Sequence, residues 1–189
     1  MADVKGSLLE DVVRLIRANK DKDWRKYLTE KDLDIIHGQI LPSSWYPLDV
    51  YERAEFAVFM EIGKGKLEMA HQWGRFLMED LVKRVYQNLI EEGDPMIALE
   101  RFSLFRKQLF RFNDPNFRVI EFQQTGEKKA RITIRIHHPV ETFEAYTHQS
   151  IGSFERLVEL AGGKNVAVNI VEYEWKGKIP YSVLDISWQ

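Results

Sequence analysis

Apolar residues in the first 112 positions recur every three or four residues, which is the period of an amphipathic α-helix. Ser7 and Thr29 precede two such segments as suitable N-cap residues, and Asp32 is spaced to complete a capping box with Thr29. Three further segments carry the same period, namely 49–62 with Asp49 as its cap, 66–91, and 96 to about 110. We therefore predict a helical part over residues 1–112.

The hydrophobic period changes after residue 112. Ile132 and Ile134 alternate with arginine and threonine, a pattern typical of a strand with one buried and one wet face. We expect strands over residues 117–123, 130–136, 166–175 and 181–188, and between the second and third a helix that starts at Pro139 and ends at Gly162-Gly163. The alternation changes parity near Ile170, which predicts a β-bulge there.

These elements predict one α+β domain over residues 1–189. Its second part, residues 113–189, runs strand–strand–helix–strand–strand and forms a four-stranded antiparallel sheet. One helix is too little to cover a face of that sheet, so we expect the N-terminal helical layer of residues 1–112 to pack on it.

Composition excludes several classes of protein. The sequence has no cysteine, so it has no disulfide, thiolate metal site or cysteine nucleophile. No apolar run approaches the roughly 20 residues of a membrane-spanning helix, and no signal peptide is evident, so we expect a cytoplasmic protein with no transmembrane segment. A formal net charge of -2 argues against a nucleic-acid partner.

Candidate catalytic or metal-binding residues are few. His138 and His148 are the best candidates for a metal or an enzyme site, because the helix carrying His148 follows the strand end at His138. Adjacent strand residues point to opposite faces, so His137 and His138 cannot easily share one metal, and both can simply bond backbone or solvent. There is no His-Glu-x-x-His motif, nucleophile elbow or phosphate-binding loop. We therefore assign no catalytic residue and no metal.

The sequence is 12% aromatic, which is compatible with a lined pocket or with a bulky core. Six large side chains on the predicted helices are the candidates to line a ligand pocket between helices and sheet: Trp73, Phe76, Phe102, Phe105, Phe143 and Phe154. Plain core packing is the alternative for the same six residues, and it is the explanation that we favour.

Three segments resemble an uncharacterised family that is multiplied in myxobacteria and related deltaproteobacteria. They are Val4-Lys5-Gly6-Ser7, the stretch from Gly38 to Pro47 containing Pro-Ser-Ser-Trp-Tyr-Pro, and the C-terminal unit with Ala161-Gly162-Gly163 and Leu184-Asp185-Ile186-Ser187-Trp188. The C-terminal half also resembles the 4-vinyl-reductase-type domain, the haem nitric-oxide-binding (H-NOX) domain and the TRAPP trafficking subunits. These resemblances imply an H-NOX/TRAPP-like fold that binds a small molecule or assembles with other proteins.

The sequence departs from the H-NOX pattern where haem is held. The resemblance calls for an axial histidine on the helix before the first strand pair, yet residues 96–110 contain none. It also calls for Tyr-x-Ser-x-Arg after the second strand, where this chain has His137-His138-Pro139-Val140-Glu141. The cysteines of the 4-vinyl-reductase-type domain are missing too. We therefore expect no cofactor and no H-NOX-type haem.

The function we predict is that of a non-enzymatic bacterial sensory or regulatory domain, which binds a hydrophobic small molecule, a protein partner, or both. One alternative is a purely structural, homodimeric interaction module, for which an exposed apolar patch on the helix of residues 66–91 would be the sign. A second alternative is an enzyme with a site built on His138 and His148.

Overall fold

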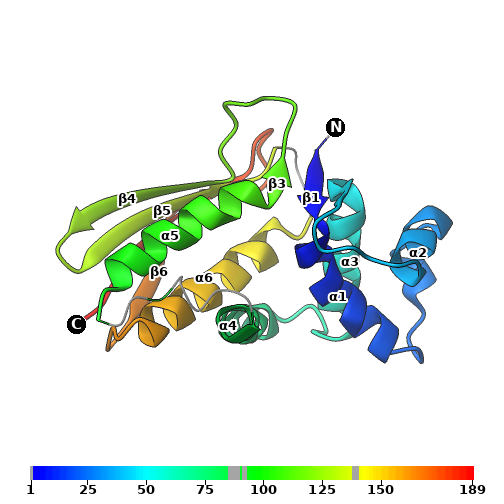
Figure 1. The fold of residues 1–189 in the computed structure, drawn as a ribbon, viewed down its shortest axis with the longest axis horizontal. Helices are drawn as coiled ribbons and strands as arrows, with labels where there is room; N and C mark the ends of the chain where they lie inside the picture. The colour runs from blue at the N-terminus through cyan, green and yellow to red at the C-terminus, as the bar shows by residue number, and fades with distance from the viewer. Residues whose placement is uncertain (1, 85–89, 91–92, 138–140) are drawn as a thin grey trace. The chain divides into compact units, whose positions relative to one another are not determined.

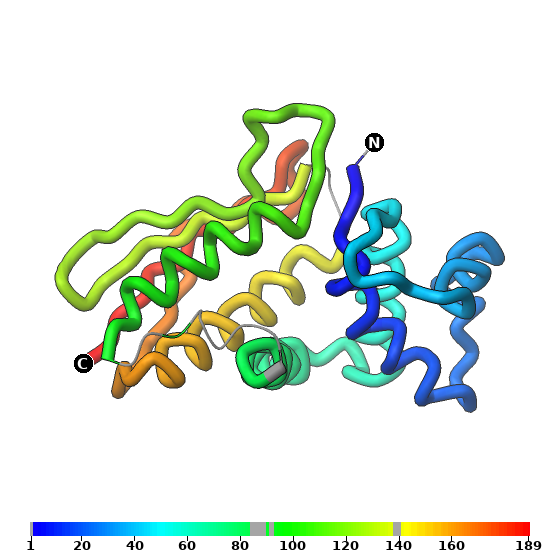
Figure 2. Tube along the Cα trace, in the orientation of Figure 1, coloured from blue at the N-terminus to red at the C-terminus, as the bar shows by residue number. Residues whose placement is uncertain are grey.

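The computed structural model describes residues 2–84, 90, 93–137 and 141–189. The chain forms two compact units, and each is interrupted in sequence by the other. Unit 1 comprises Met1–Lys66 and Gln108–Phe117, and unit 2 comprises Leu67–Lys107 and Arg118–Gln189. Figures 1 and 2 show how the chain leaves unit 1 after residue 66 and returns to it at residue 108. The prediction of one domain divided at residue 112 stays a prediction.

Unit 1 combines helices with a small antiparallel sheet of strand order β2-β1-β3. Its elements are β1 (Asp3–Lys5), α1 (Gly6–Ala18), the 3-10 turn η1 (Trp24–Lys26), α2 (Glu30–His37), β2 (Trp45–Pro47), α3 (Leu48–Glu61) and β3 (Phe110–Arg111). The sequence analysis missed these three strands.

The first turns of α1 and α3 are satisfied by backbone carbonyls, and for that reason two predicted caps are wrong. Lys5 is the N-cap of α1 instead of Ser7, and Pro47 is the N-cap of α3 instead of Asp49. The first helical N–H of α1, on Gly6, bonds the carbonyl of Ser44 at 2.9 Å, and that of α3, on Leu48, bonds the carbonyl of Ala2 at 2.9 Å. The carbonyls of the residues just before β2 and β1 thus accept the hydrogen bonds that a side-chain cap would otherwise accept.

The capping box predicted for α2 is confirmed. Thr29 Oγ1 accepts a hydrogen bond from the backbone N–H of Asp32, and the Asp32 carboxylate accepts one from the Thr29 N–H at 2.8 Å. Asp32 is 1% exposed and also accepts two hydrogen bonds from Arg53 of α3, at 2.8 and 2.7 Å. One buried carboxylate therefore fixes the start of α2 and ties it to α3.

Unit 2 contains the predicted strand–strand–helix–strand–strand order. Its elements are α4 (Leu67–Arg84), α5 (Pro95–Gln108), β4 (Ile120–Gly126), β5 (Lys129–Arg135), α6 (Phe143–Leu160), β6 (Ala167–Glu174) and β7 (Tyr181–Ser187). The sheet is antiparallel with strand order β4-β5-β7-β6. The pairing of β6 with β7 shifts register between Ile170 and Glu172, so the predicted bulge is confirmed. The chain has the α+β fold class that the sequence predicts.

Some expected boundaries differ from those observed. The first strand of the sheet begins at Ile120 and not at 117, because Phe117 belongs to unit 1, where its ring lies 4.8 Å from that of Phe112. The long helix expected over 66–91 is seen to residue 84, and the helix expected from Pro139 is seen from Phe143. Residues 85–89, 91–92 and 138–140 lie outside the described part of the chain.

The core of unit 2 lies between its sheet and its helices (Figure 1). Ile132 and Ile134 of β5 and Leu184 of β7 are at most 1% exposed, on the same face of the sheet. Phe102 of α5 and Phe154 of α6 pack on that face with their rings 5.9 Å apart, edge to face. The opposite face of the sheet carries polar pairs such as Arg131 and Asp185, so the sheet is half covered, as its alternation predicts.

Candidate functional site

The six aromatic candidates occupy three kinds of environment in unit 2. Phe102, Phe143 and Phe154 are at most 5% exposed, and Phe105 packs partly buried against the same core. Trp73 and Phe76 of α4 stack on one another with centroids 5.3 Å apart, and Phe76 is 57% exposed. The Trp73 Nε1 atom is buried with no hydrogen-bond partner in the described part of the chain. The buried and the exposed aromatics therefore do not share a single wall.

A small cavity of about 30 Å³ lies in unit 2, among α5, α6 and the strands β4 and β5. Nine residues line it: Phe102, Arg106, Ile120, Ile134, Tyr146, Gln149, Ser150, Ser153 and Phe154. Two of the six predicted pocket residues, Phe102 and Phe154, are among them. A cavity of this size has room for a few water-sized atoms, far less than the several hundred Å³ of an ordinary ligand pocket.

The cavity has one polar wall. Arg106 donates a hydrogen bond to the Tyr146 hydroxyl, and its guanidinium carbon lies 6.0 Å from the centre of the Phe102 ring and 5.8 Å from that of Tyr146. Ser153 donates its hydroxyl proton to the carbonyl of Gly74 at 3.1 Å. The sequence gives no sign that Arg106 and Tyr146 meet, because they lie 40 residues apart in the chain.

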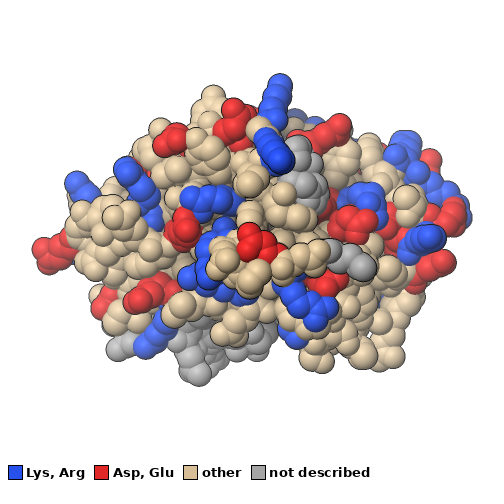
Figure 3. Space-filling model, turned by 90° about the horizontal axis from the view of Figure 1, so that it is seen from above, with Lys and Arg blue, Asp and Glu red and all other residues tan. Residues whose placement is uncertain are grey.

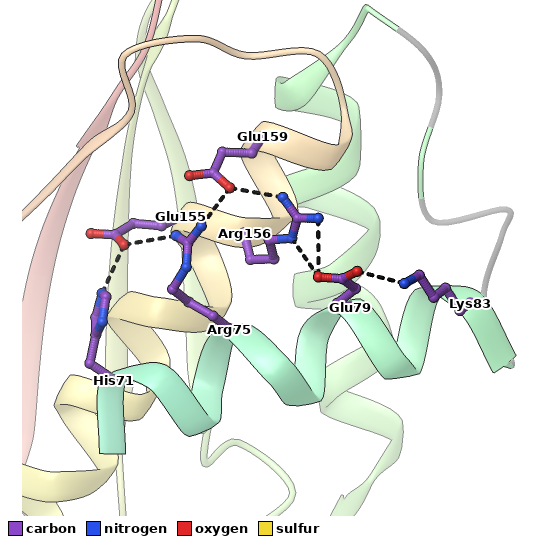
Figure 4. A network of polar contacts seen from close by, with 7 residues as sticks. All are labelled: His71, Arg75, Glu79, Lys83, Glu155, Arg156 and Glu159. Atoms are coloured by element: carbon purple, nitrogen blue, oxygen red, sulfur yellow. Dashed lines mark hydrogen bonds and ion pairs between the residues drawn. The ribbon is translucent and has the colours of Figure 1, made fainter. Parts of the chain in front are cut away.

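The helices α4 and α6 are joined by a chain of ion pairs, drawn in Figure 4. Acidic side chains alternate with basic or imidazole side chains along it. Its members are His71, Arg75, Glu79 and Lys83 of α4 and Glu155, Arg156 and Glu159 of α6. The shortest contact between the two helices joins Arg75 Nη2 to Glu159 Oε2 at 2.7 Å. Burial opposes ionisation of Glu159, but Arg75 and Arg156 outweigh it and lower the pKa of its carboxyl group.

Each arginine, lysine and glutamate of this network contacts a side chain of opposite charge, and these contacts connect α4 to α6. Its members are partly exposed, and such pairs individually contribute about 0–1 kcal/mol. The network gives these helices their register and orientation more than their stability.

The histidine candidates do not assemble into a metal site in the described part of the chain. His148 is half-buried on α6, and burial lowers the pKa of its imidazole, opposed by Glu144 and reinforced by His71. His71 Nε2 lies 2.8 Å from Glu155 Oε2. His138, the other candidate, lies outside the described residues, and among the residues that are described no three histidines or carboxylates are grouped to hold a metal ion.

Acidic and basic side chains are interspersed on the face of the molecule shown in Figure 3, and neither sign forms a continuous patch there. This agrees with the formal net charge of -2. None of the helices in the described ranges is long and apolar enough to cross a membrane.

Comparison with solved structures identifies the fold of this chain, whereas comparison of its sequence identifies no family. No family model matches the chain, and no curated protein matches its sequence. Solved H-NOX domains match it over nearly its whole length. An oxygen-binding H-NOX domain related to soluble guanylate cyclases, in complex with oxygen, is 13% identical with a TM-score of 0.65, covering 98% of this chain and 95% of that chain.

Two more solved H-NOX structures are similar to this chain over nearly its whole length. A mutant H-NOX domain of T. tengcongensis is 11% identical with a TM-score of 0.64, covering 98% of this chain and 97% of that chain. A structure from work on the mechanism of H-NOX activation is 11% identical with a TM-score of 0.62, covering 98% and 96%. The chain therefore has the fold of H-NOX domains, as the resemblance in its C-terminal half implied. The likeness to a myxobacterial family stays a prediction.

Haem, which this fold implies, does not fit the residues that are present. The helix before the first strand pair of the large sheet is α5, and none of its residues from Pro95 to Gln108 is a histidine. Its buried residues Ala98, Leu99 and Phe102 pack in the hydrophobic core of unit 2. The described histidines lie on α2, α4 and α6 and after β5, so none of them is an axial ligand on α5.

Proposed function

We propose that this chain is a non-enzymatic sensory or regulatory domain that binds a hydrophobic small molecule in unit 2 and acts on a protein partner. The H-NOX fold supports a ligand-binding role, because its solved neighbours include an oxygen-binding domain. The observation that carries the proposal is the cavity among α5, α6 and the sheet, which is lined in part by the core residues Phe102, Ile120, Ile134 and Phe154.

The walls of the cavity suit an apolar ligand with one polar end. Phe102, Phe154, Ile120 and Ile134 form its apolar side. A molecule larger than a few heavy atoms needs a side chain to move, and Tyr146 is the lining aromatic best placed to do so, because it is only half-buried. Ligand entry would then disturb the hydrogen bond between Tyr146 and Arg106, which couples α6 to α5.

A screen by thermal shift tests this function. We expect fatty acids or aromatic compounds to raise the melting temperature of the wild type. Ser150→Leu fills the cavity from α6 and should abolish the shift, whereas Asn169→Leu, on the exposed side of β6, should leave it intact. A wild type that no apolar compound stabilises, and that carries no small molecule in native mass spectrometry, would contradict the proposal.

We also propose that the domain works without haem. The support is the lack of a histidine on α5 and the departure of residues 137–141 from Tyr-x-Ser-x-Arg. Titration with haemin, followed by absorption spectroscopy, should give no saturable complex with an axial imidazole. A stoichiometric haem spectrum that is lost in His148→Ala would contradict this and would name another ligand.

A homodimeric interaction module remains the second candidate, because the sign expected for it is present on α4. Met69 is 46% and Phe76 is 57% exposed, and with Trp73 they follow at spacings of four and three residues on one face of the helix. Analytical ultracentrifugation of the wild type and of Phe76→Glu tests it. A dimer that the substitution dissociates supports the module, and a wild-type monomer at high concentration removes it.

A further inference from the structure

We propose that the cavity of unit 2 binds the oxygen of an uncharged carbonyl group, with the Ser150 hydroxyl as its hydrogen-bond donor. This inference rests on the proposed ligand-binding function and gives the chemical class of the ligand's polar end. Ketones, aldehydes and esters with an apolar remainder belong to that class.

Ser150 differs from the other buried polar residues in the described part of the chain. It is 8% exposed on α6, and its hydroxyl makes no hydrogen bond with a described residue. Two other buried hydroxyls on helices, those of Ser103 and Thr147, each donate to the carbonyl four residues earlier, at 2.8 and 2.9 Å. The Ser182 hydroxyl and the Asp32 carboxylate are hydrogen-bonded too. The Ser150 hydroxyl is therefore a buried donor that has no acceptor among the described residues.

The position of this hydroxyl favours a ligand that accepts its proton. Ser150 is one of the nine residues that line the cavity. Burial takes hydrogen bonds with water away from a hydroxyl, and without a new partner this loss opposes folding. An acceptor inside the cavity restores the lost bond, so the free energy of that bond contributes to binding.

The polar side chains around the cavity leave neutral groups for a ligand. The side-chain amide of Gln149, the residue before Ser150, lines the same cavity and makes no hydrogen bond with a described residue. The Ser153 hydroxyl already donates to a backbone carbonyl of α4. The guanidinium of Arg106 is engaged with the Tyr146 hydroxyl. A ligand therefore meets a hydroxyl and an amide, and neither carries a charge.

These neutral groups favour an uncharged acceptor over an anion or an alcohol. Moving a carboxylate out of water costs far more than moving a carbonyl group, and a hydroxyl donor does not compensate a full charge. An alcohol must bury its own proton as well, and the nine lining residues include no carboxylate to accept that proton.

Size and replacement of water also favour a carbonyl group. The cavity of about 30 Å³ has room for the carbonyl oxygen and the carbon atom that carries it. A carbonyl oxygen can replace a water molecule beside the Ser150 hydroxyl without loss of the hydrogen bond, whereas a hydrocarbon cannot. The side chains of Phe102, Ile134 and Phe154 then contact the carbon atoms next to the carbonyl group.

The experiment compares four aromatic ligands of similar shape on the full chain. Acetophenone has the carbonyl group, ethylbenzene has hydrogen atoms in place of the oxygen, the corresponding alcohol has a hydroxyl group, and benzoate has a negative charge. Isothermal titration calorimetry and NMR titration measure their dissociation constants. Ser150→Ala removes the proposed donor. Ser153→Ala is the matched control, because it removes a hydroxyl of the same helix and cavity that already has an acceptor.

We expect the wild type to bind acetophenone more tightly than the other three ligands. Ser150→Ala should weaken acetophenone roughly 2- to 10-fold, the effect of one neutral hydrogen bond, and should not weaken ethylbenzene. Ser153→Ala should keep the preference for acetophenone. Without ligand, Ser150→Ala should unfold at a temperature at least as high as the wild type, because it removes an unpaired buried hydroxyl and alanine is the better helix former.

A spectroscopic measurement separates the hydrogen bond from packing. The NMR signal of an isotope-labelled carbonyl carbon in acetophenone should move downfield on binding to the wild type, and it should move less on binding to Ser150→Ala. In the wild type this measurement tests the hydrogen bond even if a variant does not fold.

Other outcomes overturn the inference. Equal affinity of the wild type for acetophenone and ethylbenzene, or an equal effect of Ser150→Ala on both, would remove the carbonyl site and leave the proposed function standing. Tighter binding of the alcohol or of benzoate would assign another polar group to the cavity and contradict the inference. If none of the four ligands binds, the carbonyl site falls, and the ligand-binding function falls with it if the screen of apolar compounds is negative too.

Discussion

Gly74 of α4 packs directly against the main chain of Gln149 on α6, with no room for a side chain between them. A Cβ atom on Gly74 would lie 1.8 Å from the Gln149 carbonyl oxygen. The reciprocal contact is as tight, since a Cβ on Gly152 of α6 would lie 2.0 Å from the His71 carbonyl oxygen. Two glycines thus bring the backbones of α4 and α6 into contact, and the ion pairs of Figure 4 flank that crossing.

The first prediction follows from that contact. Gly74→Ala should destabilise the protein by about 1–3 kcal/mol, because the overpacking cost exceeds the roughly 1 kcal/mol by which alanine favours a helix over glycine. Chemical denaturation measures the change. Gln72→Ala, exposed on the same helix, is the control and should stay within about 0.5 kcal/mol of the wild type. A Gly74→Ala protein as stable as the control would mean that the two helices do not cross this closely.

The sequence predicted the sheet of unit 2 well, because its signals are local. Stretches of about ten residues are enough to show the alternation around Ile132 and Ile134 and the change of parity at Ile170. The structure confirms the strand pairing and the bulge. The small sheet of unit 1 was missed for the opposite reason. Its strands are two or three residues long, too short to show a period, and they pair Val4 with Tyr46 and Phe110.

The cavity could not have been found from the sequence. Its walls come from α5, β4, β5 and α6, so residues such as Arg106 and Tyr146 meet only after the helices have packed on the sheet. Of the six aromatic candidates, Phe102 and Phe154 line it because large apolar residues on helix faces are a fair guide to the core. Phe76 shows the limit of that guide, since it is mostly exposed.

A second prediction concerns acid stability and Asp32. Burial opposes ionisation of this carboxyl group, but the hydrogen bonds from Arg53 and Thr29 outweigh it and hold its pKa below the ordinary value in the folded state. A depressed folded-state pKa contributes stability above the unfolded-state pKa of about 3.9, and that stability is lost as the pH falls below it.

Asp32→Asn should therefore cost about 2–4 kcal/mol at pH 7, through the loss of the charged cap and of the pair with Arg53. The difference from the wild type should shrink as the pH falls from 5 towards 2, at about constant ionic strength. Urea denaturation at each pH measures it. A difference that is independent of pH would show that the Asp32 charge is not the cause.

Glu52 of α3 should make the stability of the protein depend on pH in the opposite direction to Asp32. Burial raises the pKa of its carboxyl group to about 8, with a smaller contribution from Asp49 that Arg53 opposes. A raised folded-state pKa means that the folded state holds its proton longer than the unfolded state does. Stability from this group is then greatest below about pH 4.3, the ordinary pKa of glutamate, and is lost as the pH rises towards 8.

Glu52→Gln should remove this loss. We expect the variant and the wild type to be about equally stable near pH 4, and the variant to be more stable by roughly 4–5 kcal/mol near pH 8. Urea denaturation over this range measures the effect, with Glu68→Gln, exposed on α4, as the control. If the two stability curves run parallel, Glu52 titrates normally in the folded protein.

The last prediction concerns a chain of buried hydrogen bonds between the sheet and α6. Trp175 Nε1 donates to Ser182 Oγ at 2.9 Å, Ser182 Oγ lies 2.8 Å from Thr147 Oγ1, and Thr147 Oγ1 donates to the Phe143 carbonyl at 2.9 Å. Because each hydroxyl has one proton, the only direction that satisfies all three bonds runs from Trp175 through Ser182 and Thr147 to Phe143.

Ser182→Ala breaks that chain at its centre and leaves the Trp175 N–H without its acceptor, which should cost about 1–3 kcal/mol. Ser187→Ala on the same strand, outside the chain, is the control and should change the free energy of unfolding by less than about 0.5 kcal/mol. Ser182→Thr, which keeps the hydroxyl, should recover part of the loss and so distinguish the hydrogen bond from packing. Indole fluorescence at Trp175 should shift in Ser182→Ala and not in Ser187→Ala, and equal stability of these two variants would show that the chain of bonds contributes nothing.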